Sequence, residues 1–242
     1  LGILRSSGDE EFTQEGQHLA KLPDFGSIAM SKAVFAALTQ YQCGRDLICL
    51  ASVLGCLNTA AIFQSIPQSM RSSDGDFMTL LNIMNDILLF RQSSERFDLT
   101  QFCAAKGLSS VHGPLQRAWI RYISLEKTFS RLPEYRKDAH IQSGNWKNIA
   151  KALLAGYGDN VFVSMKDLQG KTHRFGRYKD TKDMAVLDLQ STLIRPISEA
   201  PVSMVLAKDV RYSTAVRSTA VLSFIGELKP AWVEFQLERT IP

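Results

Sequence analysis

The segment from residue 166 to 182 combines charged and aromatic side chains in a pattern that could bind a polyanion. It holds two acidic residues, Asp167 and Asp180, and it is interleaved with Phe175 and Tyr178. Its six basic residues are Lys166, Lys171, Arg174, Arg177, Lys179 and Lys182. Basic side chains neutralise phosphates, and aromatic rings stack on bases. The segment therefore favours contact with a nucleic acid, and a solvated charged hairpin without a ligand is the structural alternative.

We predict a contact set within this segment, consisting of five cations and one ring. Its members are Lys166, Lys171, Arg174, Arg177, Lys179 and Tyr178. A β-hairpin would bring its two strands together on one basic surface. Strict alternation, however, places Lys171 and Phe175 on one face and Arg174 and Tyr178 on the other, so the five cations cannot all share one face. Phe175 is expected to lie in the core instead.

Other sequence patterns point away from catalysis in this chain. Gly170-Lys171-Thr172 resembles the end of a phosphate-binding loop, but Met165 stands where that loop needs its first glycine. The residues that follow alternate as a strand does, whereas the loop needs a helix there, so a hairpin turn is favoured. No GxSxG or HExxH motif occurs and the four histidines are scattered. We therefore predict no catalytic residue, no bound cofactor and no metal ligand in the chain.

Cysteine usage and composition indicate an ordinary intracellular chain, nuclear or cytoplasmic. The four cysteines form no CxxC pair, so we expect small buried residues in a reducing compartment rather than a zinc site. The longest apolar run, from Leu47, is broken by Ser52 and Asn58, which favours a buried helix over a membrane span. The 242 residues begin with Leu1 and show no secretory-leader pattern, so we expect an intracellular piece of a longer protein.

The charge and the hydrophobic period both change along the chain. Residues 1 to 146 hold 14 basic and 14 acidic residues, whereas residues 147 to 242 hold 14 and 10, so the whole net charge of +4 lies in the second part. Apolar residues recur every three or four positions between residues 28 and 128, which predicts packed helices. Asp76 is expected to cap one of these helices, and Gly113-Pro114 is expected to kink or break another.

The two ends of the chain have different patterns. Residues 1 to 13 suggest a strand, a turn and a strand, and Thr13 should cap a two-turn helix that ends before Pro23. A further short helix is expected from Trp146 to Leu154. After it the period changes to two, and about six short strands favour a small barrel. The expected strand sequences are VFVSM, THRFGRY, MAVLDLQ, SMVLAKDV, STAVLSFIG and WVEFQLER.

Several motifs follow one another in a fixed order along the chain. TQEGQHLAKLP (residues 13 to 23) fits T-x-x-G-x-x-L-A-x-L-P, and GDFMTLLN (75 to 82) fits G-D-x-x-T-L-L-N. FCAAKGLSSVHGPLQR (102 to 117) follows, then IAKALLAG (149 to 156), similar to I-x-K-A-L-x-A-G, and late strands that end in Lys229-Pro230-Ala231-Trp232. In this order the motifs resemble the C-terminal region of DEAH-box RNA helicases over nearly the whole chain.

The resemblance implies an α+β multidomain fold. Residues 1 to 26 would be the tail of a winged helix, 27 to 140 a helical bundle of the ratchet-like kind, and 141 to 242 an oligonucleotide-binding (OB) fold. We expect a closed five-stranded barrel held against the bundle. By the same resemblance, the six residues of the contact set would bind the backbone and bases of single-stranded RNA. The motor that moves the strand, with its ATP and Mg²⁺, would lie in RecA-like domains upstream, because no Walker A or DEAH motif is present.

Some features depart from the family pattern. The arginine-proline pair expected near Phe63 is absent, and Asp188-Leu189-Gln190-Ser191 stands where the family has H-P-S-S. Two alternatives follow for the function: a docking module for activators such as glycine-rich-patch proteins, or a helical scaffold without RNA binding. The resemblance implies no membrane partner.

Overall fold

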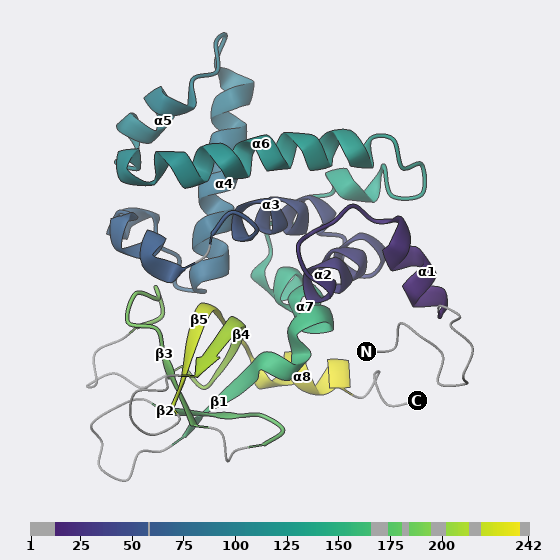
Figure 1. Ribbon diagram of the computed structural model, residues 1–242, viewed down its shortest axis with the longest axis vertical. Helices are drawn as coiled ribbons and strands as arrows, with labels where there is room; N and C mark the ends of the chain where they lie inside the picture. The colour runs from purple at the N-terminus through teal and green to yellow at the C-terminus, as the bar shows by residue number, and fades with distance from the viewer. Residues whose placement is uncertain are drawn as a thin grey trace.

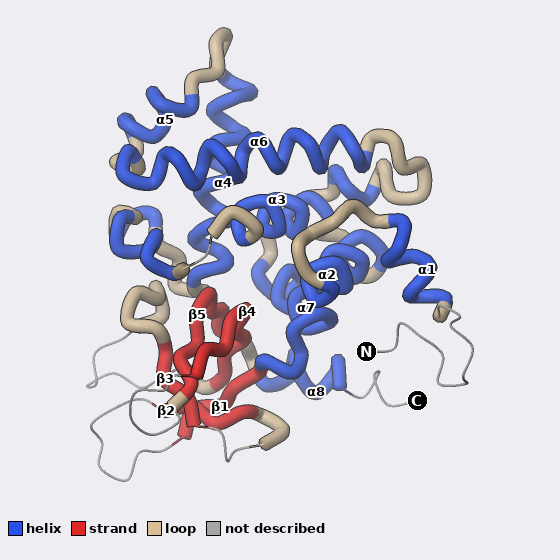
Figure 2. Tube along the Cα trace, in the orientation of Figure 1, coloured by secondary structure: helices blue, strands red, loops and turns tan. Residues whose placement is uncertain are grey.

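The computed structural model describes residues 13–57, 59–165, 174–180, 184–194, 202–212 and 219–237. The protein is α+β, with a group of packed helices above a small barrel of strands (Figure 1). Figure 2 shows that the strands gather in one part of the molecule, with helices covering one side of them. Within the described part of the chain, no helix has the length and apolar character needed to cross a membrane.

The first helix begins and ends where its sequence predicts. Helix α1 (Gln14–Lys21) follows Thr13, whose side-chain oxygen accepts a hydrogen bond from the Gly16 backbone N–H at 3.1 Å. Leu22 leaves the helix in an extended conformation, as expected for the residue before Pro23. The expected strands before Thr13 lie outside the described residues.

The bundle is built from helices whose apolar faces meet in one core. Helix α4 is apolar around most of its circumference and is buried as predicted, and the run from Leu47 lies in the buried helix α3. Cys43, Cys49 and Cys103 are buried free thiols and Cys56 is half-buried. The bundle helices are α2 (Ile28–Thr39), α3 (Gly44–Leu54), α4 (Asp76–Ser93), α5 (Leu99–Ala105) and α6 (His112–Phe129).

The break expected at Gly113-Pro114 lies a few residues earlier. Helix α6 already begins at His112, after a short 3-10 turn at Ser109–Val111, and Pro114 occupies its first turn. Proline is tolerated there because the first-turn N–H groups have no partner within the helix. The sequence therefore predicted the break correctly but placed it inside the helix instead of before it.

Five strands close into a barrel, as predicted. They are β1 (Val161–Met165), β2 (Arg174–Arg177), β3 (Met184–Leu187), β4 (Met204–Tyr212) and β5 (Ala220–Glu227). The order around the barrel is β1-β2-β3-β5-β4, and the neighbouring strands are antiparallel except for the parallel pair β3 and β5. This architecture is compatible with the predicted OB fold.

The sixth predicted strand is wrong. Residues 232–237 of the expected strand WVEFQLER belong to helix α8 (Pro230–Leu237), and its last two residues lie outside the described part of the chain. Pro230 is the first residue of that helix, a position that suits proline because its fixed φ is helical and its missing N–H would have no helical partner. Pro230, just before the expected strand, was the sequence signal for the start of a helix. The alternating apolar residues after it led to the wrong prediction of a strand.

Two groups of buried side chains hold the protein together. One fills the barrel interior and includes Phe162, Phe175 and Leu222, so the core position expected for Phe175 is confirmed. The other fills the bundle and continues over the outer faces of β1 and β4, where Val161 and Leu206 belong to it. One side of the barrel is therefore covered by helices.

Helix α7 (Trp146–Tyr157) joins the bundle to the barrel. It begins at Trp146 as predicted and runs beyond Leu154. Near its end, Gly156 packs so closely on α2 that an added Cβ would lie 1.9 Å from the carbonyl oxygen of Ala29. Only glycine permits this approach of the two helices.

Candidate nucleic-acid interface

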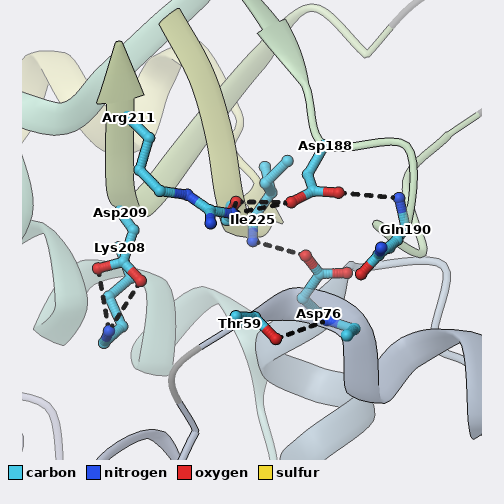
Figure 3. Close-up of polar contacts among 10 residues, drawn as sticks. Thr59, Asp76, Asp188, Gln190, Lys208, Asp209, Arg211 and Ile225 are labelled. Atoms are coloured by element: carbon cyan, nitrogen blue, oxygen red, sulfur yellow. Dashed lines mark hydrogen bonds and ion pairs between the residues drawn. The ribbon is translucent and has the colours of Figure 1, made fainter. Parts of the chain in front are cut away.

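A buried carboxylate connects the bundle to the barrel. Asp76 is fully buried, and its Oδ1 accepts hydrogen bonds from the Thr192 backbone N–H at 2.7 Å, the Thr192 hydroxyl at 2.9 Å and the Ser191 hydroxyl at 3.1 Å. Its Oδ2 accepts a bond from the Ile225 N–H at 2.8 Å (Figure 3). Burial raises the pKa of Asp76, and these donated bonds act in the opposite direction. The position of the barrel relative to the bundle is thus fixed by specific bonds.

The prediction that Asp76 caps its helix is wrong. Gly75 precedes helix α4 with a φ of 115°, and no side chain caps the helix there. Asp76 is the first helical residue, and its side chain points to the barrel instead. A cap needs only local sequence, whereas this carboxylate serves partners more than a hundred residues away.

Backbone and aromatic contacts surround this carboxylate. Gly75 forms an isolated β-bridge with Gly226, and an added Cβ on Gly75 would lie 2.4 Å from the Ile225 carbonyl oxygen. The Trp146 indole N–H donates to the carbonyl of Glu227 at 2.7 Å, and its ring stacks on Phe77 with centroids 6.2 Å apart. The two glycines therefore allow the bundle and the barrel to meet backbone to backbone.

The predicted contact set is only partly within the described residues. Lys166 and Lys171 lie outside them. Arg174 is exposed at the start of β2, opposite Met165 of β1. Within the described residues, no carboxylate lies within ion-pair distance of Arg174.

Two other cations of the set converge on one residue. Arg177 donates to the Asp159 carbonyl at 2.9 Å, and its guanidinium lies 5.3 Å from the centre of the Phe162 ring. Lys179 forms an ion pair with the Asp159 carboxylate at 3.3 Å, and both of these side chains are more than half exposed. The structure therefore brings Arg177 and Lys179 together and leaves Arg174 at the other end of β2. Such an exposed pair is weak and exchanges readily with solvent.

Tyr178, the ring predicted to stack on a base, contacts the bundle core in the structure. Tyr178 is half-buried and packs against the edge of the bundle core. Its backbone N–H donates to the Val161 carbonyl at 2.8 Å, which fixes the chain after β2. A role for Tyr178 in base stacking stays a prediction.

Sequence analysis missed Arg211, on β4. Its guanidinium Nη2 donates to Asp188 Oδ2 at 3.1 Å and to the Ser223 hydroxyl at 2.7 Å, and that hydroxyl donates to the same Asp188 oxygen at 2.8 Å (Figure 3). The Arg211 side chain is still 51% exposed, while that of Asp188 is 14% exposed. An arginine is thus held in one orientation with part of its donor surface facing solvent. The sequence signal, one of two cations near the end of a strand that also holds Asp209, is too common to be found without the pairing.

Arg211 and Arg174 lie on one outward-facing row of the barrel. Arg211 pairs with Val221 of β5, which pairs with Val186 of β3. Continuing the β2–β3 register by one residue sets Arg174 beside Val186. Because the neighbours Ala185 and Leu222 are buried inside the barrel, the row itself faces outward. At about 4.8 Å per strand, three steps place the two arginine backbones roughly 14 Å apart.

The row has the composition of a surface for a flexible polyanion. Two cations stand at its ends and two half-buried valines between them. Within the described residues, no group of three or more His, Cys, Asp or Glu side chains could hold a metal ion. These four residues offer the positive charge used in single-strand binding, and their apolar members are valines rather than the aromatic rings on which bases stack.

Comparison with known proteins found no relative of this chain among protein families or curated proteins. The helicase resemblance, its winged-helix remnant and the domain boundaries at residues 26 and 140 therefore stay predictions from the sequence.

Proposed function

We propose that this chain is the C-terminal accessory region of a DEAH-box RNA helicase and that its barrel grips single-stranded RNA. The observation that carries the proposal is the outward row from Arg174 to Arg211 on a barrel of OB-compatible strand order. Oligonucleotides bind OB folds across the second and third strands and near the loop between the fourth and fifth. Arg174 belongs to the second strand, and Arg211 is the next-to-last residue of the fourth strand, one residue from that loop.

The mechanism in this proposal is electrostatic and mechanical. Cations neutralise backbone phosphates without reading sequence, while apolar side chains between them accept the faces of bases. The bonds of Asp76 keep the barrel from turning against the bundle, so a pull on the strand is transmitted to the whole body. ATP hydrolysis would take place in RecA-like domains upstream, with ATP and Mg²⁺ bound there and not in this chain.

A salt titration of single-stranded RNA binding tests the proposal. For single strands, the logarithm of the binding constant falls with the logarithm of salt concentration by about 0.7 per phosphate contact. The double variant Arg174→Glu, Arg211→Glu should bind more weakly and lower the slope by about 1.4. The matched control is the double variant Arg117→Glu, Arg131→Glu, which makes the same charge change on two exposed residues in and just after α6, away from the barrel.

The outcomes distinguish RNA binding by the barrel from a protein-docking function. If the barrel double variant and the Arg117→Glu, Arg131→Glu control reduce the slope equally, binding reflects net charge alone and the barrel is not the RNA-binding surface. If wild-type protein does not bind single-stranded RNA at low salt, the RNA-binding proposal fails for this region. A docking module for glycine-rich-patch proteins would instead bind its peptide with little dependence on salt.

A further inference from the structure

A cleft of about 650 Å³ lies where the bundle meets the barrel. It is separate from the outward row and is lined by the chain before α2, the end of α3, the end of α7 and strand β4. Its volume is within the range of sites for small organic ligands. The predicted contact set contains no residue of this lining.

The cleft has an apolar floor and a polar side. Met30, Leu54 and Leu57 form part of the floor, and Tyr157 and Asn160 lie on the side toward the barrel. Burial raises the pKa of Tyr157, which keeps its hydroxyl protonated and able to donate, while hydrogen bonding with Ser27 acts in the opposite direction. Such a mixture suits a flat, uncharged ligand with a polar edge.

Charge argues against a phosphate inside this cleft. Its charged lining residues are Asp159, Asp209 and Lys208, which leaves one net negative charge. Lys208 is also engaged, because its Nζ lies 3.0 Å from both carboxylate oxygens of Asp209. A bound anion would face a carboxylate with no free cation among these lining side chains.

Cations stand just outside the cleft, however. Asp159 lines the cleft and also contacts Arg177 through its carbonyl and Lys179 through its carboxylate. A phosphate beside Arg177 and Lys179 would therefore be adjacent to the cleft opening. A cleft without a free cation among its lining side chains thus lies next to two cations, as an uncharged base lies next to its phosphate in a nucleotide.

We propose that the cleft binds one unstacked nucleoside of the strand held by the barrel. The proposal rests on the proposed RNA-binding function and names a further site within it. Asn160 donates through Nδ2 to the Lys208 carbonyl at 3.3 Å, and within the described residues its Oδ1 has no hydrogen-bond partner. A side-chain amide with a free acceptor pairs with the donor edge of a base, and unstacked bases of single-stranded RNA are recognised at such edges.

An abasic scan of a single-stranded oligonucleotide tests this site. With the full 242-residue chain, removing the base at one internal position should weaken binding about tenfold, within the range for losing one base contact. Removing bases elsewhere should cost less. In Asn160→Ala the intact oligonucleotide should bind more weakly, and the abasic penalty at that position should shrink, as for two coupled groups.

The control variant is Asn82→Ala, which removes an exposed amide from α4 far from the cleft. It should leave the scan unchanged. Asn160→Asp is a second cleft variant in case the alanine variant unfolds, and it should also reduce the penalty because it places another negative charge beside the ligand. The nucleoside site is overturned if the wild type shows the same affinity loss at every abasic position, or if the loss is equal in the wild type and both cleft variants. Neither result contradicts RNA binding by the barrel.

A second measurement separates failure of the site from failure of the proposed function. Adenosine or uridine alone, added at millimolar concentration, should shift the NMR signals of the Met30 methyl group and the Tyr157 ring. If the chain does not bind RNA, these shifts still support the cleft as a nucleoside site. If neither nucleoside moves these signals while a basic peptide does, the cleft belongs to a protein partner and the proposal is wrong.

Discussion

The backbone N–H of Ile225 donates a 2.8 Å hydrogen bond to the Asp76 carboxylate, across 149 residues of chain. Asp76 stands at the first turn of a bundle helix and Ile225 inside a barrel strand. With the bonds from Ser191 and Thr192, this contact makes one carboxylate the centre of the junction. Asp76 is therefore one of the contacts that set the placement of the barrel relative to the bundle, together with the Gly75–Gly226 bridge and the Trp146 hydrogen bond.

Replacing this carboxylate should destabilise the protein. Asp76→Ala leaves the Thr192 and Ile225 N–H groups without acceptors in a dry site, and we expect a loss of about 3 to 5 kcal/mol in the free energy of unfolding. Urea unfolding followed by circular dichroism measures it. The control is Asp86→Asn, which removes only an exposed pair with Lys106 and should cost less than about 1 kcal/mol. Equal losses for both variants would contradict the central role of Asp76.

A second buried aspartate should make stability depend on pH. Asp46 Oδ2 accepts bonds from the N–H groups of Ser143 at 2.8 Å and Gly144 at 3.2 Å, while its buried Oδ1 has no partner within the described residues. Burial raises the pKa of Asp46 in the folded protein above the unfolded value of about 3.9. The unfolded chain then loses this proton first. The free energy of unfolding should therefore decrease as pH rises from about 3.9 through the folded pKa.

Asp46→Asn isolates this effect. The amide keeps an acceptor for Ser143 and Gly144 and cannot ionise, so the decrease in unfolding free energy over that pH window should be smaller than in the wild type. At pH 7 the variant should be at least as stable as the wild type, because no charge is buried. Urea titrations at several pH values give the comparison. A variant with an unchanged pH profile would show that Asp46 does not contribute.

Local signals predicted the elements of the fold, and long-range pairing decided the site. Thr13 and Pro23 mark the ends of α1 because capping and proline sterics act within a few residues. The change of period after Gly156 predicted the barrel for the same reason. Arg211 could not be selected in this way, because its importance comes from Asp188, which follows strand β3. Asp76 shows the same limit, since a local cap and a long-range anchor have the same sequence signal.

The close packing of α7 on α2 should be sensitive to a single methyl group. In Gly156→Ala the new Cβ would lie 1.9 Å from the Ala29 carbonyl oxygen, so the helices must separate. We expect a loss of about 1 to 3 kcal/mol in the free energy of unfolding. Gly158→Ala is the matched control, because nothing lies within 4 Å of its Cβ and its φ is −57°. That substitution should be neutral or stabilise by up to about 1 kcal/mol.

The anchoring of Arg211 gives a prediction in which charge and geometry oppose each other. Asp188→Ala removes a negative charge, so a surface that binds RNA by net charge alone would bind more tightly. The same change removes the acceptor that Arg211 Nη2 contacts at 3.1 Å and releases the arginine from its fixed orientation. If the proposed grip depends on that orientation, affinity for single-stranded RNA should fall about three- to tenfold, the effect of about 1 kcal/mol of lost side-chain order. Fluorescence anisotropy at fixed salt measures it, with Asp86→Asn as the control for a lost negative charge on the bundle. Tighter binding by Asp188→Ala would mean that Asp188 only repels the strand and that Arg211 needs no partner to act.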